Sequence, residues 1–138
     1  QACARVLMER SQVGMRALGR LYETATFHLH ERLVVATVDE RLVAQLDLAE
    51  TDLEGIVDGM VFIQGVEMAA LLIQRPNGAV KCSLRSRGGV DVCLLAQELS
   101  DHGGGHHNAA GATVQMPLPD VVCRVIALTR TRLVAQAS

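Results

Sequence analysis

Scarce aromatic residues set the first limit on what this sequence can do. The chain of 138 residues has no tryptophan, and its 2% of aromatic residues are Tyr22, Phe27 and Phe62. Proteins that hold single-stranded nucleic acid without sequence preference stack bases on several aromatic side chains. A platform of that kind is therefore largely excluded. A nucleotide ligand would be held mainly by its phosphates and its sugar.

The sequence also lacks a strong positive charge and a long hydrophobic run. Its formal net charge is -2, which argues against tight, non-specific binding of long duplexes because such binding needs a broad basic surface. No apolar run approaches the roughly 20 residues of a membrane-spanning helix. With 49% hydrophobic and 20% charged residues, the composition is globular. We expect a soluble protein with no membrane partner.

Metal-binding and disulfide patterns are missing as well. Cys3, Cys82, Cys93 and Cys123 form no CxxC pair and have no histidine at zinc-finger spacing. This favours reduced, mostly buried thiols over disulfides or a zinc site, and predicts a cytoplasmic location. The opening QACARVLMERSQVG has no initiator methionine, arginine-rich leader or signal-type run. We therefore expect a piece of a larger protein without an export signal.

The N-terminal half predicts helices around one hairpin. Apolar residues recur at helical intervals in the first 24 residues, interrupted by glycines. The segment TFHLHERLVVATV alternates and then becomes a β-branched run, which is typical of a hairpin. Two aspartates and a threonine offer helix caps further on. The predicted elements are a broken helix over 2–24, a hairpin over 26–38, a helix from Asp39 through Leu46, and a helix over 53–63 capped by Thr51 or Asp52.

The C-terminal half predicts a second hairpin and two more helices. VEMAALLIQ and AVKCSLRSR are joined by RPNG, whose proline and Asn-Gly pair are a strong turn signal. Asp91 can cap a helix over 92–99, ATVQM can form a short strand, and Pro119 can begin a final helix. Hairpins and helices do not alternate strictly. The predicted fold class is therefore α+β, with a mixed β-sheet flanked by helices in a single domain.

The strand KCSLRSR has a basic face. Because alternate side chains of a strand share a face, Lys81, Ser83, Arg85 and Arg87 point one way and the residues between them point the other. An ordinary solvated face of an antiparallel sheet explains such a row. Two arginines beside a serine also suit an anion, since guanidinium groups bond phosphate oxygens in pairs.

The stretch SDHGGGHHNAAGA combines backbone freedom with imidazole groups. Its three glycines, at 103–105, let a ligand approach the main chain closely. If a short helix begins near His106, its free N–H groups and its dipole favour an anion. The stretch lacks both the Gly-Lys-Ser/Thr of a Walker loop and the GxGxxG spacing of a dinucleotide turn. Together with the basic strand, it favours a phosphate or nucleotide contact.

A metal site is an alternative for the same stretch. Asp101, His102, His106 and His107 carry groups that ligate zinc or similar ions. Three intervening glycines disfavour helical presentation of His102 and His106, and no distant carboxylate or cysteine is an obvious fourth ligand. A bound metal and plain loop histidines stay open beside the favoured phosphate contact.

These motifs occur in a familiar order. VKCSLRSRGGVDVCLLAQEL followed by GGGHHNAAGATV resembles the C-terminal DHH-associated domain of the DHH phosphoesterases, which has a Ser-Leu-Arg-Ser segment, a Val-Asp-Val helix and a Gly-Gly-Gly-His motif. TDLEGIVDGMVFIQGVEMAALL is similar to this family too, so the resemblance runs from about Leu18 to Val114. The sequence is most similar to the branch of bacterial oligoribonucleases and phosphoadenosine-phosphate phosphatases. A related domain ends alanyl-tRNA synthetases.

The resemblance implies that substrate binding and hydrolysis belong to different domains. Residues 1–25 would be a helical connector from an upstream DHH domain, and residues 26–138 the substrate-binding domain. The DHH domain, absent from this chain, would hydrolyse phosphoesters with two manganese ions that activate water. No catalytic residue and no metal ligand is expected here. The implied partners are a short oligonucleotide or nucleotide phosphate and the DHH domain, and a homodimer is left open.

The resemblance also implies which residues contact substrate. The expected contacts are Arg85 and Arg87 to phosphate, Ser83 and Ser86 in support, Gly103, Gly104 and Gly105 through close backbone, and His106 and Asn108 to phosphate or nucleoside. Two other functions are weighed against this one. A non-catalytic RNA-binding module would need a wider basic surface than a net charge of -2 suggests. A structural or dimerisation domain would leave the glycine stretch without a ligand.

Overall fold

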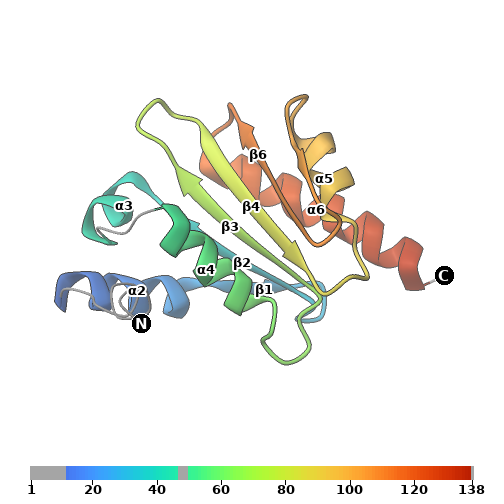
Figure 1. The fold of residues 1–138 in the computed structure, drawn as a ribbon, viewed down its shortest axis with the longest axis horizontal. Coiled ribbons are helices and arrows are strands. Elements are labelled where there is room, and N and C mark those ends of the chain that lie inside the picture. The colour runs from blue at the N-terminus through green and yellow to red at the C-terminus, as the bar shows by residue number, and fades with distance from the viewer. Residues whose placement is uncertain (1–11, 47–49, 138) are drawn as a thin grey trace.

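Six strands form one mixed sheet in the computed structural model, which describes residues 12–46 and 50–137 (Figure 1). The strands are β1 (Thr26–His28), β2 (Leu33–Val38), β3 (Met68–Gln74), β4 (Val80–Ser86), β5 (Gly104–Gly105) and β6 (Ala109–Val114). Their order across the sheet is β1-β2-β3-β4-β6-β5. Only the β2–β3 pair is parallel among these strands. The predicted α+β class with a mixed sheet is confirmed.

Helices cover both faces of this sheet. They are α2 (Gln12–Thr24), α3 (Glu40–Leu46), α4 (Glu50–Met60), α5 (Val92–Leu99) and α6 (Leu118–Ala137). Asp91 caps α5 as predicted, because its carboxylate accepts hydrogen bonds from the N–H groups of Cys93 and Leu94. In the part of the chain that the structure describes, no helix is long and apolar enough to cross a bilayer.

Helix α4 differs from its prediction at both ends. It begins at Glu50, so Thr51 and Asp52 lie within the helix and not before its first residue. It ends at Met60, and the N–H groups of Phe62 and Ile63 then bond three residues back, to the carbonyl oxygens of Gly59 and Met60, in tighter turns. Gly65, with φ of 87°, then redirects the chain into β3.

The N-terminal helix belongs to the same packed unit as the sheet. Leu21 of α2 is fully buried and packs with Val34 and Leu42. Of the broken helix predicted over 2–24, residues 2–11 lie outside the described residues. The division between a connector ending at residue 25 and a domain starting at residue 26 stays a prediction.

Two apolar cores lie on opposite faces of the sheet (Figure 1). The first packs α5 and α6 against β2, β3, β4 and β6, through residues such as Cys82, Leu84 and Ala110. The second packs α2, α3 and α4 against β2 and β3 only, through residues such as Val34 and Leu71. On the second face the apolar core ends at β3, β6 and β5 lie beyond it, and α4 meets β4 through the polar pair of Asp58 and Arg85.

The glycine stretch forms a β-hairpin, so the short helix near His106 that was considered as a possible anion site does not form. The pairs Gly104–Gly111 and Gly105–Ala110 join β5 to β6, and His106 and Ala109 exchange backbone hydrogen bonds of 2.7 and 3.3 Å across the turn. The N–H groups that a helix would have left free for an anion are partly used in this pairing. Strand pairing outweighs the local helical tendency of the alanines that follow.

Two of the three consecutive glycines are needed by the fold. A Cβ on Gly103 would lie 2.0 Å from the carbonyl oxygen of Ala96 in α5. Gly105 has φ of 143°, and a Cβ there would lie 2.7 Å from the carbonyl oxygen of Ala109. A Cβ on Gly104 would meet no atom within 4 Å. Gly104 is thus the member of the stretch that steric packing does not explain.

We predict that alanine substitutions separate these roles. Gly103→Ala should lower the free energy of unfolding by about 1–3 kcal/mol, because the methyl group must displace a backbone carbonyl. Gly104→Ala should change it by less than about 0.5 kcal/mol. Urea denaturation followed by circular dichroism measures both. Equal destabilisation by the two substitutions would contradict the close packing of Gly103 on α5.

The cysteines that the structure describes are free thiols, as predicted, but they are less buried than predicted. Cys82, Cys93 and Cys123 are all free; Cys82 is buried, Cys93 half-buried and Cys123 exposed. Cys3 lies outside the described residues. Burial raises the pKa of the Cys82 thiol from 9.0 to about 12.

The raised pKa predicts how the thiols react. At pH 8 a thiol reagent should modify Cys123 rapidly in the native protein and reach Cys82 only after denaturation, because the reactive species is the thiolate. Above pH 9 the unfolded chain ionises Cys82 while the folded chain does not, so this group lowers stability as pH rises towards 12. Mass spectrometry of labelled peptides measures the rates. Equal rates for the two cysteines would contradict the burial of Cys82.

Candidate functional site

Beyond the apolar core of the second face, β4, β6 and β5 place basic side chains beside glycines that have no side chain. Cross-strand partners point to the same side of a sheet, so the pairings Ser83–Gly111 and Gly104–Gly111 set one row across three strands. The pairings Arg85–Ala109 and Lys81–Thr113 lie on either side of it. We call these seven residues the open face: Lys81, Ser83, Arg85, Gly104, Ala109, Gly111 and Thr113.

The middle row of the open face consists of Ser83, Gly111 and Gly104, which have small side chains or none. Gly104 and Gly111 have none, and Ser83 is only 4% exposed. Lys81 and Arg85 lie four residues apart on β4, about 13 Å at strand rise. A ligand on this face could therefore reach the main chain at Gly104 and Gly111, on the strands beside these two cations. Three members of the row predicted from alternation, Lys81, Ser83 and Arg85, share this face, although Ser83 is nearly covered. The fourth, Arg87, follows the end of the strand.

Arg85 is held in place from the second face. Its Nε donates to Oδ1 of Asp58 in α4 at 2.6 Å, and its Nη1 donates to the carbonyl oxygen of Leu84 at 3.0 Å. The Arg85 side chain is 15% exposed and that of Asp58 is 60% exposed. The structure gives Nη2 no partner among the described residues. One end of the guanidinium is fixed and the other can still bind an anion.

Arg87 and Ser86 make contacts within the chain. Arg87 donates from Nε to the carbonyl oxygen of Val61 at 2.9 Å and from Nη2 to that of Ile63 at 3.4 Å. Ser86 is buried on the opposite face of β4, where its hydroxyl donates to the carbonyl oxygen of Val90 at 2.7 Å. Neither side chain joins the open face. Their predicted contacts with substrate stay predictions.

The turn at residues 106–109 lies beside the Arg85 end of the open face. Ser86 N–H donates to the carbonyl oxygen of Asn108 at 3.0 Å, and Val92 N–H donates to that of His107 at 2.9 Å. These bonds fix the turn between β4 and α5. The side chains of His106 and Asn108 are exposed and make no hydrogen bond with any described residue, so both are free to contact a ligand.

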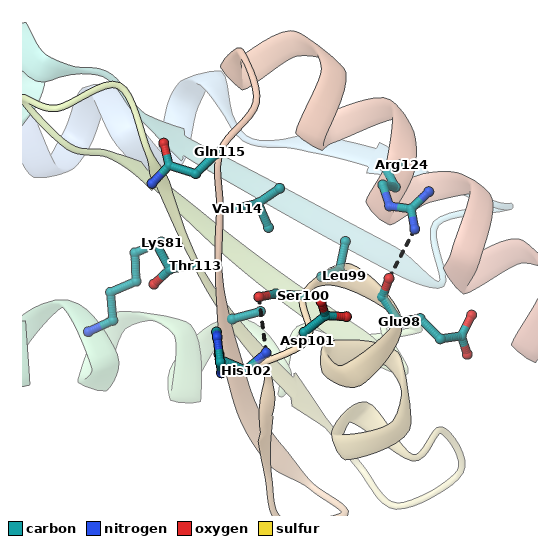
Figure 2. Close-up of a pocket in the computed structure, with 12 residues that line it drawn as sticks. Lys81, Glu98, Leu99, Ser100, Asp101, His102, Thr113, Val114, Gln115 and Arg124 are labelled. Atoms are coloured by element: carbon teal, nitrogen blue, oxygen red, sulfur yellow. Dashed lines mark hydrogen bonds between the residues drawn. The ribbon is translucent and has the colours of Figure 1, made fainter.

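A cavity of about 780 Å³ lies at the other end of β6 (Figure 2). Figure 2 shows Lys81 and Gln115 on one side of it and the segment of Ser100, Asp101 and His102 on the other. It touches the open face at Lys81, Gly111 and Thr113 but includes neither Arg85 nor His106. The cavity therefore extends the open face along the edge of β6 and does not coincide with the residues predicted to bind phosphate.

The metal alternative finds no cluster to support it. Among the described residues, no three histidine, cysteine, aspartate or glutamate side chains are grouped so as to hold a metal ion. His107 is instead used within the fold, with Nε2 2.7 Å from the carbonyl oxygen of Gly88 and Nδ1 3.4 Å from a carboxylate oxygen of Asp91. Asp91 is the α5 cap, so this ring helps to hold the turn against the helix.

Three of the nine residues expected to contact substrate lie on the open face: Ser83, Arg85 and Gly104. Gly105 pairs with Ala110 of the first core and belongs to the other side of the sheet. His106 and Asn108 follow directly in the turn. Sequence reasoning missed Asp58, which orients Arg85, and Phe62, which Arg87 contacts. Both lie near the end of α4, and no local sequence signal places that helix end beside β4.

Other proteins are similar to this chain in sequence and in fold. The DHHA1 domain model matches residues 30–131. The bifunctional oligoribonuclease and PAP phosphatase NrnA of Thermus thermophilus is 35% identical over 119 residues, which is 86% of this chain and 34% of that protein. The chain thus spans about a third of the length of this relative.

Two solved structures show the same fold. An exopolyphosphatase-related protein from Bacteroides fragilis superimposes with a TM-score of 0.81 at 22% identity, over 94% of this chain and 38% of that one. The C-Ala domain of Aquifex aeolicus alanyl-tRNA synthetase superimposes with a TM-score of 0.53 at 14% identity, over 70% of this chain and 88% of that one. Fold, motifs and sequence agree, and the chain belongs to the DHHA1 domain family.

Proposed function

We propose that this chain is the substrate-binding part of a manganese-dependent phosphoesterase that acts on short oligoribonucleotides or nucleoside bisphosphates. The observation that carries the proposal is the open face, where a half-free guanidinium and bare glycine backbone lie on the same side of three strands. The Thermus relative is named for activity on substrates of this class. A cytoplasmic location, predicted from the cysteines, is part of the proposal.

The chemistry of the open face suits one phosphate group. Arg85 can donate a charge-assisted hydrogen bond from its free Nη2 while Asp58 holds Nε. Gly104 lets phosphate oxygens approach the backbone, since no Cβ stands in the way. His106 and Asn108 add free donors at the rim. These groups bind and orient the ligand, and none is placed to activate water.

Hydrolysis would then require a second domain. In the proposed enzyme, manganese ions on the DHH domain activate water and stabilise the charge on the phosphate. The present chain would hold the substrate against that centre. Two or three charge-assisted hydrogen bonds, at about 1.5–3 kcal/mol each, give a dissociation constant on the order of millimolar to high micromolar for this half of the site.

We predict that Arg85→Ala weakens binding of adenosine 3′,5′-bisphosphate by about 10-fold or more, because one charge-assisted hydrogen bond is lost. Arg130→Ala, which removes an exposed arginine of α6, serves as the matched control and should leave the affinity unchanged. Ligand-detected NMR measures both dissociation constants. Equal losses in the two variants would show that only general positive charge matters and would contradict a site at Arg85.

We also predict that the chain by itself does not hydrolyse phosphoesters. Incubated with millimolar manganese and a dinucleotide or adenosine 3′,5′-bisphosphate, it should release product no faster than buffer alone. Chromatography of the nucleotides measures the rate. Manganese-dependent turnover that is removed by a chelator would contradict the proposed division of labour.

A further inference from the structure

Phe62 is an aromatic ring left in solvent beside the candidate site. It follows α4 directly, and it is 74% exposed. The chain has only two other aromatic residues, Tyr22 and Phe27. A phenylalanine so far from the core adds little to the stability of the fold, because most of its apolar surface remains hydrated.

Arg87 covers one face of this ring. The centre of its guanidinium lies 5.7 Å from the centre of the Phe62 ring, within the range of a cation–π contact. The same guanidinium donates to the carbonyl oxygens of Val61 and Ile63, the residues on either side of Phe62. Three contacts therefore fix Arg87 against the turn. The ring is supported from one side while most of its surface stays accessible.

The supported ring and the partner of Arg85 come from the same end of α4. Asp58 binds Arg85 from the last turn of α4, four residues before Phe62. Arg85 and Arg87 are two residues apart along β4, about 6.6 Å at strand rise. The end of α4 thus contacts both arginines. The spacing between an anion at Arg85 and a ring at Arg87 is on the scale of the ribose that separates a phosphate from its base.

We propose that Phe62, supported by Arg87, stacks on the base of a nucleotide whose phosphate is bound at Arg85. This inference rests on the proposed function and deepens it, because it selects ligands that carry a base, such as nucleoside bisphosphates and oligonucleotide ends, over inorganic phosphate chains. Arg87 then acts as a positioning residue, because it holds the Phe62 ring in place for the base. The scarcity of aromatic residues is consistent with one stacking contact and not a platform.

The test compares two ligands that differ in having a base. Dissociation constants of adenosine 3′,5′-bisphosphate and of pyrophosphate are measured by NMR titration for the unchanged chain and for Phe62→Leu. Loss of one exposed stacking contact should weaken nucleotide binding by about 5- to 10-fold, with pyrophosphate binding unchanged. Phe62→Trp should bind the nucleotide more tightly. The Phe62 ring protons should shift upfield with the nucleotide and not with pyrophosphate.

Matched controls separate this inference from the proposed function. Phe27→Leu removes a ring that is 47% exposed on β1, at the other edge of the sheet, and should change neither affinity. If Arg85→Ala weakens both ligands but Phe62→Leu weakens neither, or weakens both equally, the stacking role is wrong and the phosphate site remains. If the unchanged chain binds neither ligand at millimolar concentration, the proposed function fails and the stacking role fails with it.

Discussion

The limited reach of the second apolar core is the constraint on which the candidate site depends. Helices α2, α3 and α4 bury the side chains of β2 and β3, such as Val34 and Leu71, and the apolar surface ends there. On β4 the same face carries Lys81 and Arg85. Covering these charges with an apolar helix would desolvate them at a cost of several kcal/mol each. The apolar cover of this face therefore stops at β3, and α4 meets β4 through the ion pair of Asp58 and Arg85.

Helices α5 and α6 cover the first face, and their packing fixes the strands that carry the open face. Cys82, Leu84 and the alanines of β6 pack against α5 and α6, which holds β4 and β6 flat against one core. The approach of Gly103 to the Ala96 carbonyl brings β5 against α5 and extends the sheet by one short strand. Gly104 then pairs with Gly111 in the uncovered region. Packing on one face thus sets the backbone that the other face presents.

The sequence predicted the elements whose signals are local. The RPNG turn, the Asp91 cap and the alternation of β4 each depend on residues within a few positions. The short helix considered near His106 does not form, because the glycine stretch pairs through Gly104 and Gly111. Local propensity does not decide between a hairpin and a helix there.

The candidate site was predictable in part for the same reason. The basic row on β4 and the glycine stretch could be named from the sequence, and strand alternation put Arg85 on the correct face. The burial of Ser83 and the contacts of Arg87 could not be foreseen, because α4 and its following turn lie over 20 residues away in the chain. Asp58 and Phe62 enter the site only through that packing.

Mapping the backbone amide shifts on addition of adenosine 3′,5′-bisphosphate tests the central claim most directly. The claim is that the open face, and no other surface, binds the nucleotide. We expect saturable shifts concentrated at Ser83, Gly104 and Gly111 and in the turn at 106–109, with α6 unaffected. Shifts concentrated on α5 and α6, or no localised shifts at millimolar ligand, would contradict it.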